Sequence, residues 1–330
     1  MNYVDYIIIV VYLVGFLGLG YLFMEINFSG DYFLGGRSMG WFPLSLSTMA
    51  TQLSAISFIS APAFVGLKEG GGLQWLTYEF GVPLAMAFLL IALIPTLYKS
   101  GIVSVYEYLE KRFDASSRLL ISFVFQISRS VATGVMVYTM ALILQATIGI
   151  EFWISILIIG VITLVYSFQG GMKAVIWGDV VQMIILFLGI VICLGYGISE
   201  LGGWDNFLTH VDKDRLTAVD FSKWGFNNAD GNDAFGFWPM VIGGFFLYTS
   251  YYGTDQTQSQ RLLSADGMST IKKLLLANGL FRFPLTLTYC IMGLVLGTLL
   301  FSDMGFQEAM DQTYALNVDS LEGKKADLMV

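Results

Sequence analysis

The chain has 330 residues, of which 56% are apolar and only 13% charged, whereas soluble domains carry about 25% charged residues. So few polar groups cannot cover a globule of this size, and the composition therefore excludes a water-soluble protein and predicts one whose solvent is lipid. The net charge of −8 reflects acids gathered in 200–233 and 303–327, which we expect to be water-facing loops, and no patch of basic and aromatic residues indicates nucleic-acid binding.

Apolar stretches long enough to cross a bilayer, which takes about 20 residues, predict about eight transmembrane helices. They lie at 3–24, 41–66, 73–97, 117–147, 152–168, 175–199, 237–259 and 271–301. The first has neither a basic segment before it nor an A-x-A site after it, so we expect a retained helix rather than a signal peptide. With the N-terminus outside, the inner loops hold more Lys and Arg, Arg261 among them, than the outer loops. We therefore expect a multi-pass protein of the plasma or inner membrane in that orientation.

The second apolar stretch, 41–66, is unusually rich in hydroxyl and amide side chains. They are Ser45, Ser47, Thr48, Thr51, Gln52, Ser54, Ser57 and Ser60. Hydroxyls can serve as packing contacts between helices. Here they occur all round the helix and are densest at 51–57, near the middle of the bilayer. A helix that unwinds there frees backbone carbonyls to bind a hard cation such as sodium.

Four ionisable residues interrupt the apolar stretches, and such residues are costly in lipid and usually functional. They are Glu79, Arg129, Asp179 and Arg282. The alternative for each is a structural ion pair between two helices. That alternative is weaker for Asp179, because Lys173 is the only cation near it in the sequence and should reach the inner surface.

The seventh stretch ends in tyrosines and hydroxyl residues between Tyr248 and Thr254. Such side chains suit stacking on a sugar-like or amide ligand, and they suit an anchoring belt at the membrane interface equally well. Both interpretations stay open at this stage.

The residues that would support an enzyme or a metal site are missing from the sequence. Cys193 and Cys290 lie in apolar stretches, where we expect small buried hydrophobes, and His210 lies in a polar loop without metal-binding partners. There is no Walker A loop, H-E-x-x-H sequence or serine elbow. We therefore expect no enzymatic activity and no cofactor.

Four segments together resemble the sodium/solute symporter family, which includes sodium–glucose, iodide, vitamin and sialic acid cotransporters. They are the serine-rich stretch 41–66, the sequence YEYLEKRF at 106–113, the segment 170–182, and GTDQ at 253–256 with Gln260 and Arg261 after it. Their order and spacing agree over essentially the whole chain. The resemblance implies an all-α membrane protein with the inverted five-plus-five helix repeat of the leucine-transporter type and one extra N-terminal helix.

The same resemblance divides the single membrane transport domain, 1–330, into segments. We expect the extra helix at 3–24, the first five-helix repeat at 41–199, an outer loop at 200–236, two helices of the second repeat at 237–301, and an outer polar segment at 302–330. The second repeat would then be incomplete, which predicts a chain truncated at its C-terminus.

The family resemblance implies sodium as the coupling ion. Family members bind sodium through backbone carbonyls at the helix break, which fall on Ala50 and Leu53. Asp179 matches an acid that some members use for a second sodium or for gating. The remaining sodium ligands of the family lie on a helix of the second repeat beyond this chain.

For the solute, Ser54 and Ser57 match binding positions on the broken helix, and Tyr251 matches an aromatic gate beneath the ligand. Glu79 falls on a polar position that contacts sugars, and Gln74 is the alternative because the preceding loop is slightly longer.

Two arginines complete the implied solute site. Arg282 stands where sugar transporters have a lysine, and Arg129 matches an arginine that holds the carboxylate of sialic acid. These matches favour a carboxylated or sugar-like solute. Glu79 would then need a cation partner, for which Arg129 is our expectation.

The resulting prediction is sodium-coupled symport of a small polar solute by alternating access. The expected partners are the solute, sodium and the lipid bilayer, and the sequence leaves protein partners unknown. The alternatives are a membrane receptor with a transporter fold that binds ligand without moving it, and an inactive part of a symporter.

Overall fold

The computed structural model describes residues 3–23, 29–53, 55–226, 235–302, 305–308 and 311, and the regular elements in these ranges are helices. The long and medium helices are α1 (Tyr3–Leu22), α3 (Trp41–Gln52), α4 (Ala55–Gly66), α5 (Gly81–Phe88), α8 (Ala115–Ile148), α9 (Phe152–Glu200), α11 (Phe237–Gly253) and α13 (Met268–Ser302). The short ones are α2 (Ser29–Leu34), η1 (Gly35–Arg37), η2 (Leu73–Phe80), η3 (Leu89–Leu93), α6 (Ile94–Lys99), α7 (Val105–Arg112), α10 (Trp204–His210), η4 (Lys213–Leu216) and α12 (Gln256–Leu263).

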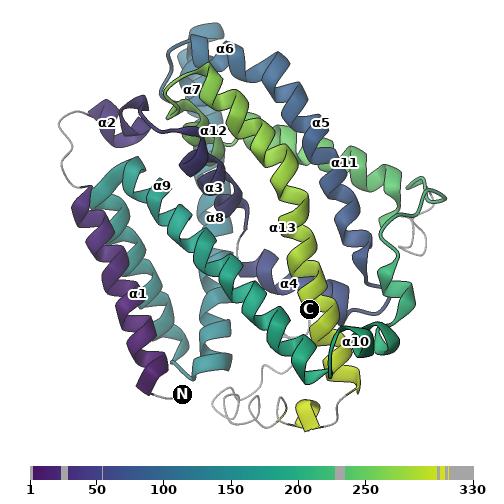
Figure 1. Ribbon diagram of the computed structural model, residues 1–330. Helices are drawn as coiled ribbons and strands as arrows, with labels where there is room; N and C mark the ends of the chain where they lie inside the picture. The colour runs from purple at the N-terminus through teal and green to yellow at the C-terminus, as the bar shows by residue number, and fades with distance from the viewer. Residues whose placement is uncertain are drawn as a thin grey trace.

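Helices occupy most of the described residues in the eight predicted apolar stretches. Four continuous helical segments in the described part of the chain are long and apolar enough to cross a membrane, namely Leu73–Lys99, Ala115–Ile148, Phe152–Glu200 and Met268–Ser302. Helix α9 includes two of the predicted stretches. The chain is kinked between them at Gly171, which adopts φ 56° and ψ −152°. Only glycine reaches that conformation without strain. Figure 1 shows the two arms of α9, one beside α1 and the other running toward α10.

The second predicted stretch is broken, as its hydroxyl-rich sequence predicted. Helix α3 ends at Gln52 and α4 begins at Ala55. Leu53 has φ −87° and ψ 85°, and its N–H bonds back to the carbonyls of Met49 and Ala50. Ser54 lies outside the described residues. Two of the last four carbonyls of α3, those of Met49 and Ala50, thus accept the Leu53 N–H. A break of this kind frees other backbone groups at the two helix ends.

Helix α13 forms the axis of the bundle and packs against α3, α4, α5 and α9 (Figure 1). Its approach to α4 depends on glycines. A Cβ on Gly66 would lie 2.0 Å from the carbonyl oxygen of Gly293, and a Cβ on Gly297 would lie 2.3 Å from the carbonyl oxygen of Gly66. The two helices therefore touch backbone to backbone, as small residues permit between membrane helices.

Three expectations need correction. Helix α11 ends at Gly253, not at 259, because the Asp255 side chain accepts the N–H of Thr257 and starts a new helix, α12. Cys193 is exposed on α9, whereas Cys290 is buried as expected. His210 lies in the last turn of α10 rather than in a loop, and no cluster of metal-binding side chains was found in the described part of the chain.

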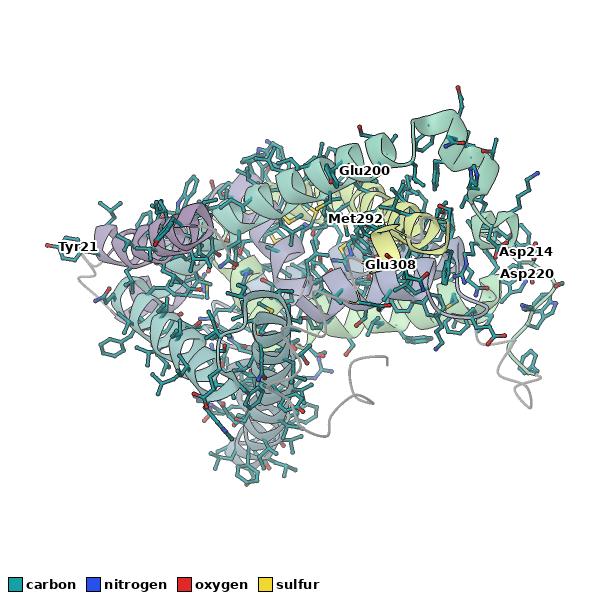
Figure 2. The ribbon with its side chains drawn as sticks, turned by 90° about the horizontal axis from the view of Figure 1, so that it is seen from below. Tyr21, Glu200, Asp214, Asp220, Met292 and Glu308 are labelled. Carbon is teal, nitrogen blue, oxygen red and sulfur yellow. The ribbon has the colours of Figure 1, made fainter. Side chains whose placement is uncertain are left out.

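The two ends of the bundle differ in their connections. Figure 1 shows α2, α6, α7 and α12 gathered at one end, which we call the α12 end, and α10 at the other. Seen from below in Figure 2, Tyr21 points away from the bundle, Met292 lies among the helices, and Asp214 and Asp220 stand at the rim on the segment that connects α10 to α11.

Candidate functional site

Arg282 and Glu79 form the electrostatic centre of the site, beside the break between α3 and α4. Both are buried, with 5% and 1% of their surface exposed. The Arg282 Nε lies 3.3 Å from both carboxylate oxygens of Glu79, and its Nη1 donates to the Gln52 side-chain oxygen. Glu79 also accepts hydrogen bonds from Thr286 Oγ1 at 2.8 Å and from the Tyr248 hydroxyl at 3.2 Å.

The expected pairing of Glu79 with Arg129 is therefore wrong. Glu79 lies on η2, which packs against α13, so it meets Arg282 inside the bundle. Arg129 lies on α8, whose principal packing partners are α7 and α9. Each buried charge needs a partner nearby, and the packing of the helices decides which one it finds.

Gln52, the last residue of α3, retains unused hydrogen-bonding capacity. Its side-chain nitrogen is buried and makes no hydrogen bond of normal geometry in the described part of the chain, although the Tyr252 hydroxyl lies near the amide. The indole nitrogen of Trp75 on η2 is a second buried donor without a hydrogen-bond partner among the described residues. A buried amide donor without an acceptor is costly unless a ligand or water satisfies it. Gln52 therefore offers a donor at the break itself.

Asn278 lies one turn before Arg282 on α13 and holds Thr48, one turn before Gln52 on α3. Its Nδ2 donates to Thr48 Oγ1 at 3.0 Å, and its Oδ1 accepts the Tyr252 hydroxyl at 2.7 Å. Residues Ala50 and Leu53, whose carbonyls we expect to bind sodium, follow directly after this anchored turn. Sequence reasoning missed Asn278, although an amide in the middle of an apolar stretch was an available signal.

Asp179 lies on the second arm of α9 and has a cation partner, contrary to the sequence-based expectation. Its Oδ2 accepts hydrogen bonds from Arg261 Nη2 at 2.7 Å and from Ser47 Oγ at 2.5 Å. Arg261 lies 82 residues further along the chain and is buried on α12, so it is not a solvated loop residue. Lys173, the only cation near Asp179 in the sequence, is not its partner.

Arg129 on α8 pairs with the carboxylate of Asp255, at the junction of α11 and α12. Its guanidinium lies 5.7 Å from the ring centroids of both Phe125 and Tyr251. Burial, with the nearby Asp255 carboxylate, raises the pKa of Tyr106 on α7 to about 12. Arg129 therefore lies beside Tyr251, and a carboxylate of the protein itself pairs with the arginine.

The remaining predicted residues lie elsewhere or are not described. The Gln74 side chain donates to the carbonyl of Gly70 at 2.6 Å and lines a cavity of about 210 Å³ with Asp212 and Arg215, away from the Glu79 cluster. Ser54 and the side chain of Ser57 lie outside the described residues. Of the two alternatives raised by the sequence, Glu79 and not Gln74 lies beside Arg282.

A cavity of about 550 Å³ between α3, α9 and α13 has an apolar lining that includes Met49, Met183 and Leu285. It offers a polar solute almost no hydrogen bonds. The candidate site is therefore the polar region at the helix break.

The chain resembles known sodium-coupled transporters in sequence and in fold. The sequence profile of the sodium:solute symporter family matches residues 32–312. The human sodium/iodide cotransporter is 32% identical over 267 residues, which is 81% of this chain and 40% of the cotransporter. The mouse sodium-coupled monocarboxylate transporter 2 is 32% identical over 237 residues, covering 72% of this chain and 37% of the transporter. The chain thus spans about two fifths of the length of these curated relatives.

A solved structure of a sodium-coupled sialic acid symporter, substrate-bound and outward-open, matches 96% of this chain and 67% of the symporter chain. The TM-score is 0.84 at 24% sequence identity. The chain therefore has the fold of that symporter, which confirms the all-α, leucine-transporter type of architecture expected from the sequence.

Proposed function

The chain belongs to the sodium:solute symporter family, and from this premise we propose that its helices bind a small anion and sodium at the helix break for alternating-access symport. The observation that carries the anion is the buried Gln52 side-chain nitrogen, which makes no hydrogen bond of normal geometry in the described part of the chain. An anionic oxygen would supply an acceptor for it.

The start of α4 adds to this preference for a negative charge. The first N–H groups of a helix have no partner within it, and the helix dipole favours an anion at that end. Arg282 lies beside Gln52 and orients its amide, while Glu79 balances the arginine charge. The Arg282–Glu79 pair therefore carries no net charge. The preference for an anion would come from the start of α4 and from the Gln52 side chain.

The relatives support the same class of solute. By their names, one carries iodide, others carry monocarboxylates, and the structural neighbour carries sialic acid. These solutes share a single negative charge at neutral pH. We propose a small carboxylate for this chain, since a carboxylate can accept hydrogen bonds from Gln52 and from the start of α4 together.

For sodium we propose the backbone carbonyls of Ala50 and Leu53, in the turn that Asn278 anchors through Thr48. Sodium is bound by oxygen ligands, and an unwound segment supplies them without a charged side chain. One sodium carried with one carboxylate moves no net charge, so the sodium concentration gradient would drive accumulation of the solute; only a further sodium ion would add about 2.3 kcal/mol per 100 mV of membrane potential.

A thermal-unfolding screen of the purified protein in detergent tests the ligand class. The ligands are a short monocarboxylate, iodide, sialic acid and glucose, each in sodium and in choline medium. We expect the anions to raise the unfolding temperature only with sodium. Gln52→Ala should abolish that rise, whereas Gln74→Ala, the matched control, should preserve it. Stabilisation by glucose alone, or equal stabilisation in choline, would contradict the proposal.

A further inference from the structure

The C-terminal end of α4 is held by an arginine from a distant part of the chain. The Arg215 Nη1 donates to the carbonyl of Val65 at 3.0 Å and to the carbonyl of Lys68 at 2.9 Å. Arg215 lies on η4, 150 residues after Val65, and only 15% of its side chain is exposed. A guanidinium at this place supplies a donor to the last carbonyls of a helix and a positive charge at its negative end.

The packing of this helix end leaves space beside it. Gly66, the last residue of α4, approaches α13 backbone to backbone at Gly293 and Gly297. A cavity of about 360 Å³ lies at the same contact, and Gly66, Arg215 and Thr298 are among the residues that line it. The contact with α13 limits how closely α4 can approach, but the cavity gives its end room to shift. The hydrogen bonds of Arg215 therefore fix a position that packing alone does not.

The segment that carries Arg215 is itself docked on the bundle at the end opposite the α12 end. Phe207 of α10 and Val211 are buried, with 2% and 4% of their surface exposed, in one apolar cluster with Val65. The Asp212 carboxylate lies 3.6 Å from Arg215 Nε, and Figure 2 shows the following stretch at the rim of the bundle. The arginine therefore reaches α4 from a fixed base.

The same segment, 211–218, also contacts η2, the helix that carries Glu79. Gly72 directly precedes η2, and a Cβ on this glycine would lie 2.8 Å from the Arg215 Cα. The Thr77 hydroxyl donates to the carbonyl of Ala218. Thr77 stands two residues before Glu79, so segment 211–218 joins the end of α4 to the helix that bears the buried carboxylate of the candidate site.

We propose that Arg215 is a positioning residue, which clamps the C-terminal end of α4 and so holds this half-helix where its first turn receives the solute anion. This inference rests on the proposed function, which places the anion at the start of α4. Helix α4 has 12 residues and is thus about 18 Å long, so Arg215 acts through the position of the helix and does not touch the solute. Without the clamp, α4 occupies the competent position for less of the time, and the apparent affinity falls by that fraction.

The first measurement is solute binding. It is the concentration of a short monocarboxylate that gives half-maximal thermal stabilisation of the purified protein at saturating sodium. Arg215→Ala should raise this concentration about tenfold, the equivalent of one hydrogen bond to a charged group. Arg215→Lys keeps the charge but not the fork that reaches two carbonyls, and should raise it about threefold, half of the loss in free energy. Lys213→Ala is the matched control, since it removes an exposed cation from the same short helix and should bind like the parent.

The sodium dependence separates positioning from a general loss of structure. The carbonyls proposed for sodium, those of Ala50 and Leu53, precede α4. In the absence of solute, Arg215→Ala should therefore leave the half-maximal sodium concentration unchanged. An equal weakening of sodium and solute binding would show a general structural defect and overturn the proposal. Weakening of solute binding by Lys213→Ala to the same degree as by Arg215→Ala would overturn it as well.

Hydrogen exchange of the ligand-free protein in detergent tests the clamp independently of the proposed function. The amides of 55–67 should exchange faster in Arg215→Ala than in the parent, with the amides of α8 as the internal reference. Gly72→Ala, whose added methyl group must displace the backbone of Arg215, should have the same effect with the guanidinium intact. Exchange at the parent rate in the folded variants overturns the clamp.

The two measurements distinguish failure of the clamp from failure of the proposed function. Faster exchange in α4 supports the clamp even if the parent binds no monocarboxylate, a result that would contradict only the proposed function. Where Arg215→Ala does not fold, the same readouts in Arg215→Lys and Gly72→Ala decide the question.

Discussion

Arg282 of α13 and Glu79 of η2 form a buried ion pair whose partners stand 203 residues apart in the chain. The pair joins the end of the broken helix, through Gln52, to two segments that are distant in sequence. The two charges of this pair cancel. The remaining sources of positive potential in the proposed site are therefore the start of α4 and the amide donor of Gln52.

The first prediction concerns the stability of this pair. Glu79→Gln leaves Arg282 charged and buried without a carboxylate, and we expect the free energy of unfolding to fall by about 3–5 kcal/mol. Denaturant unfolding in detergent measures the change. Glu110→Gln removes the exposed partner of Arg118 and should cost at most about 1 kcal/mol. Similar losses in the two variants would contradict a specific role for the buried pair.

The second prediction concerns the contact between α4 and α13. A Cβ on Gly293 would lie 2.5 Å from the carbonyl oxygen of Pro62, so Gly293→Ala must push the two helices apart. We expect a loss of about 1–3 kcal/mol, typical of overpacking, together with weaker solute binding. Gly243→Ala on α11 is the control, because nothing lies within 4 Å of its added methyl group. An unchanged unfolding temperature in Gly293→Ala would show that the helices do not approach so closely.

The third prediction separates sodium binding from solute binding. Asn278→Ala removes the anchor of Thr48 and leaves the turn before Ala50 less fixed. We expect the sodium concentration for half-maximal stabilisation to rise about fivefold, the equivalent of one hydrogen bond of about 1 kcal/mol. Thr298→Ala is the control, because the Thr298 hydroxyl donates to the carbonyl of Leu294 within its own helix. A shift in solute affinity without a shift in sodium affinity would place the sodium site elsewhere.

The fourth prediction is a pH dependence at α7, which contacts the start of α12. The N–H of Val103 and the ammonium of Lys111 lower the pKa of Glu107 below its ordinary value of 4.5. A lowered pKa in the folded state stabilises the protein above pH 4.5, and the contribution is lost as the pH falls through the lowered pKa. Glu107→Gln should therefore unfold at a lower temperature than the parent at pH 7, and the difference should shrink below pH 4.5. A constant difference would exclude the carboxylate as its source.

The sequence predicted those features that depend on local composition. The apolar stretches predicted where the long helices lie, and hydroxyls near Gln52 predicted the break that the structure has at Leu53. The glycine that divides α9 was visible only as a polar, glycine-rich gap, since its φ of 56° cannot be read from composition.

Partners across the bundle could not be predicted in the same way. The cations that pair with Glu79 and Asp179 lie on α13 and α12, and nothing near either acid in the sequence indicates them. A charge in an apolar stretch predicts that a partner exists, whereas the helix packing decides its identity. The cap at Asp255 was overlooked for a related reason, because the apolar residues before it suggested one continuous helix.

The central claim is sodium-coupled transport of an anion at the helix break, and uptake by the protein reconstituted in liposomes tests it most directly. A radiolabelled short monocarboxylate is added outside under an inward sodium gradient or an equal choline gradient. We predict accumulation with sodium only, with a raised half-saturation concentration in Gln52→Ala and an unchanged one in Gln74→Ala. Equal uptake in sodium and choline, or equal behaviour of the two glutamine variants, would contradict the account.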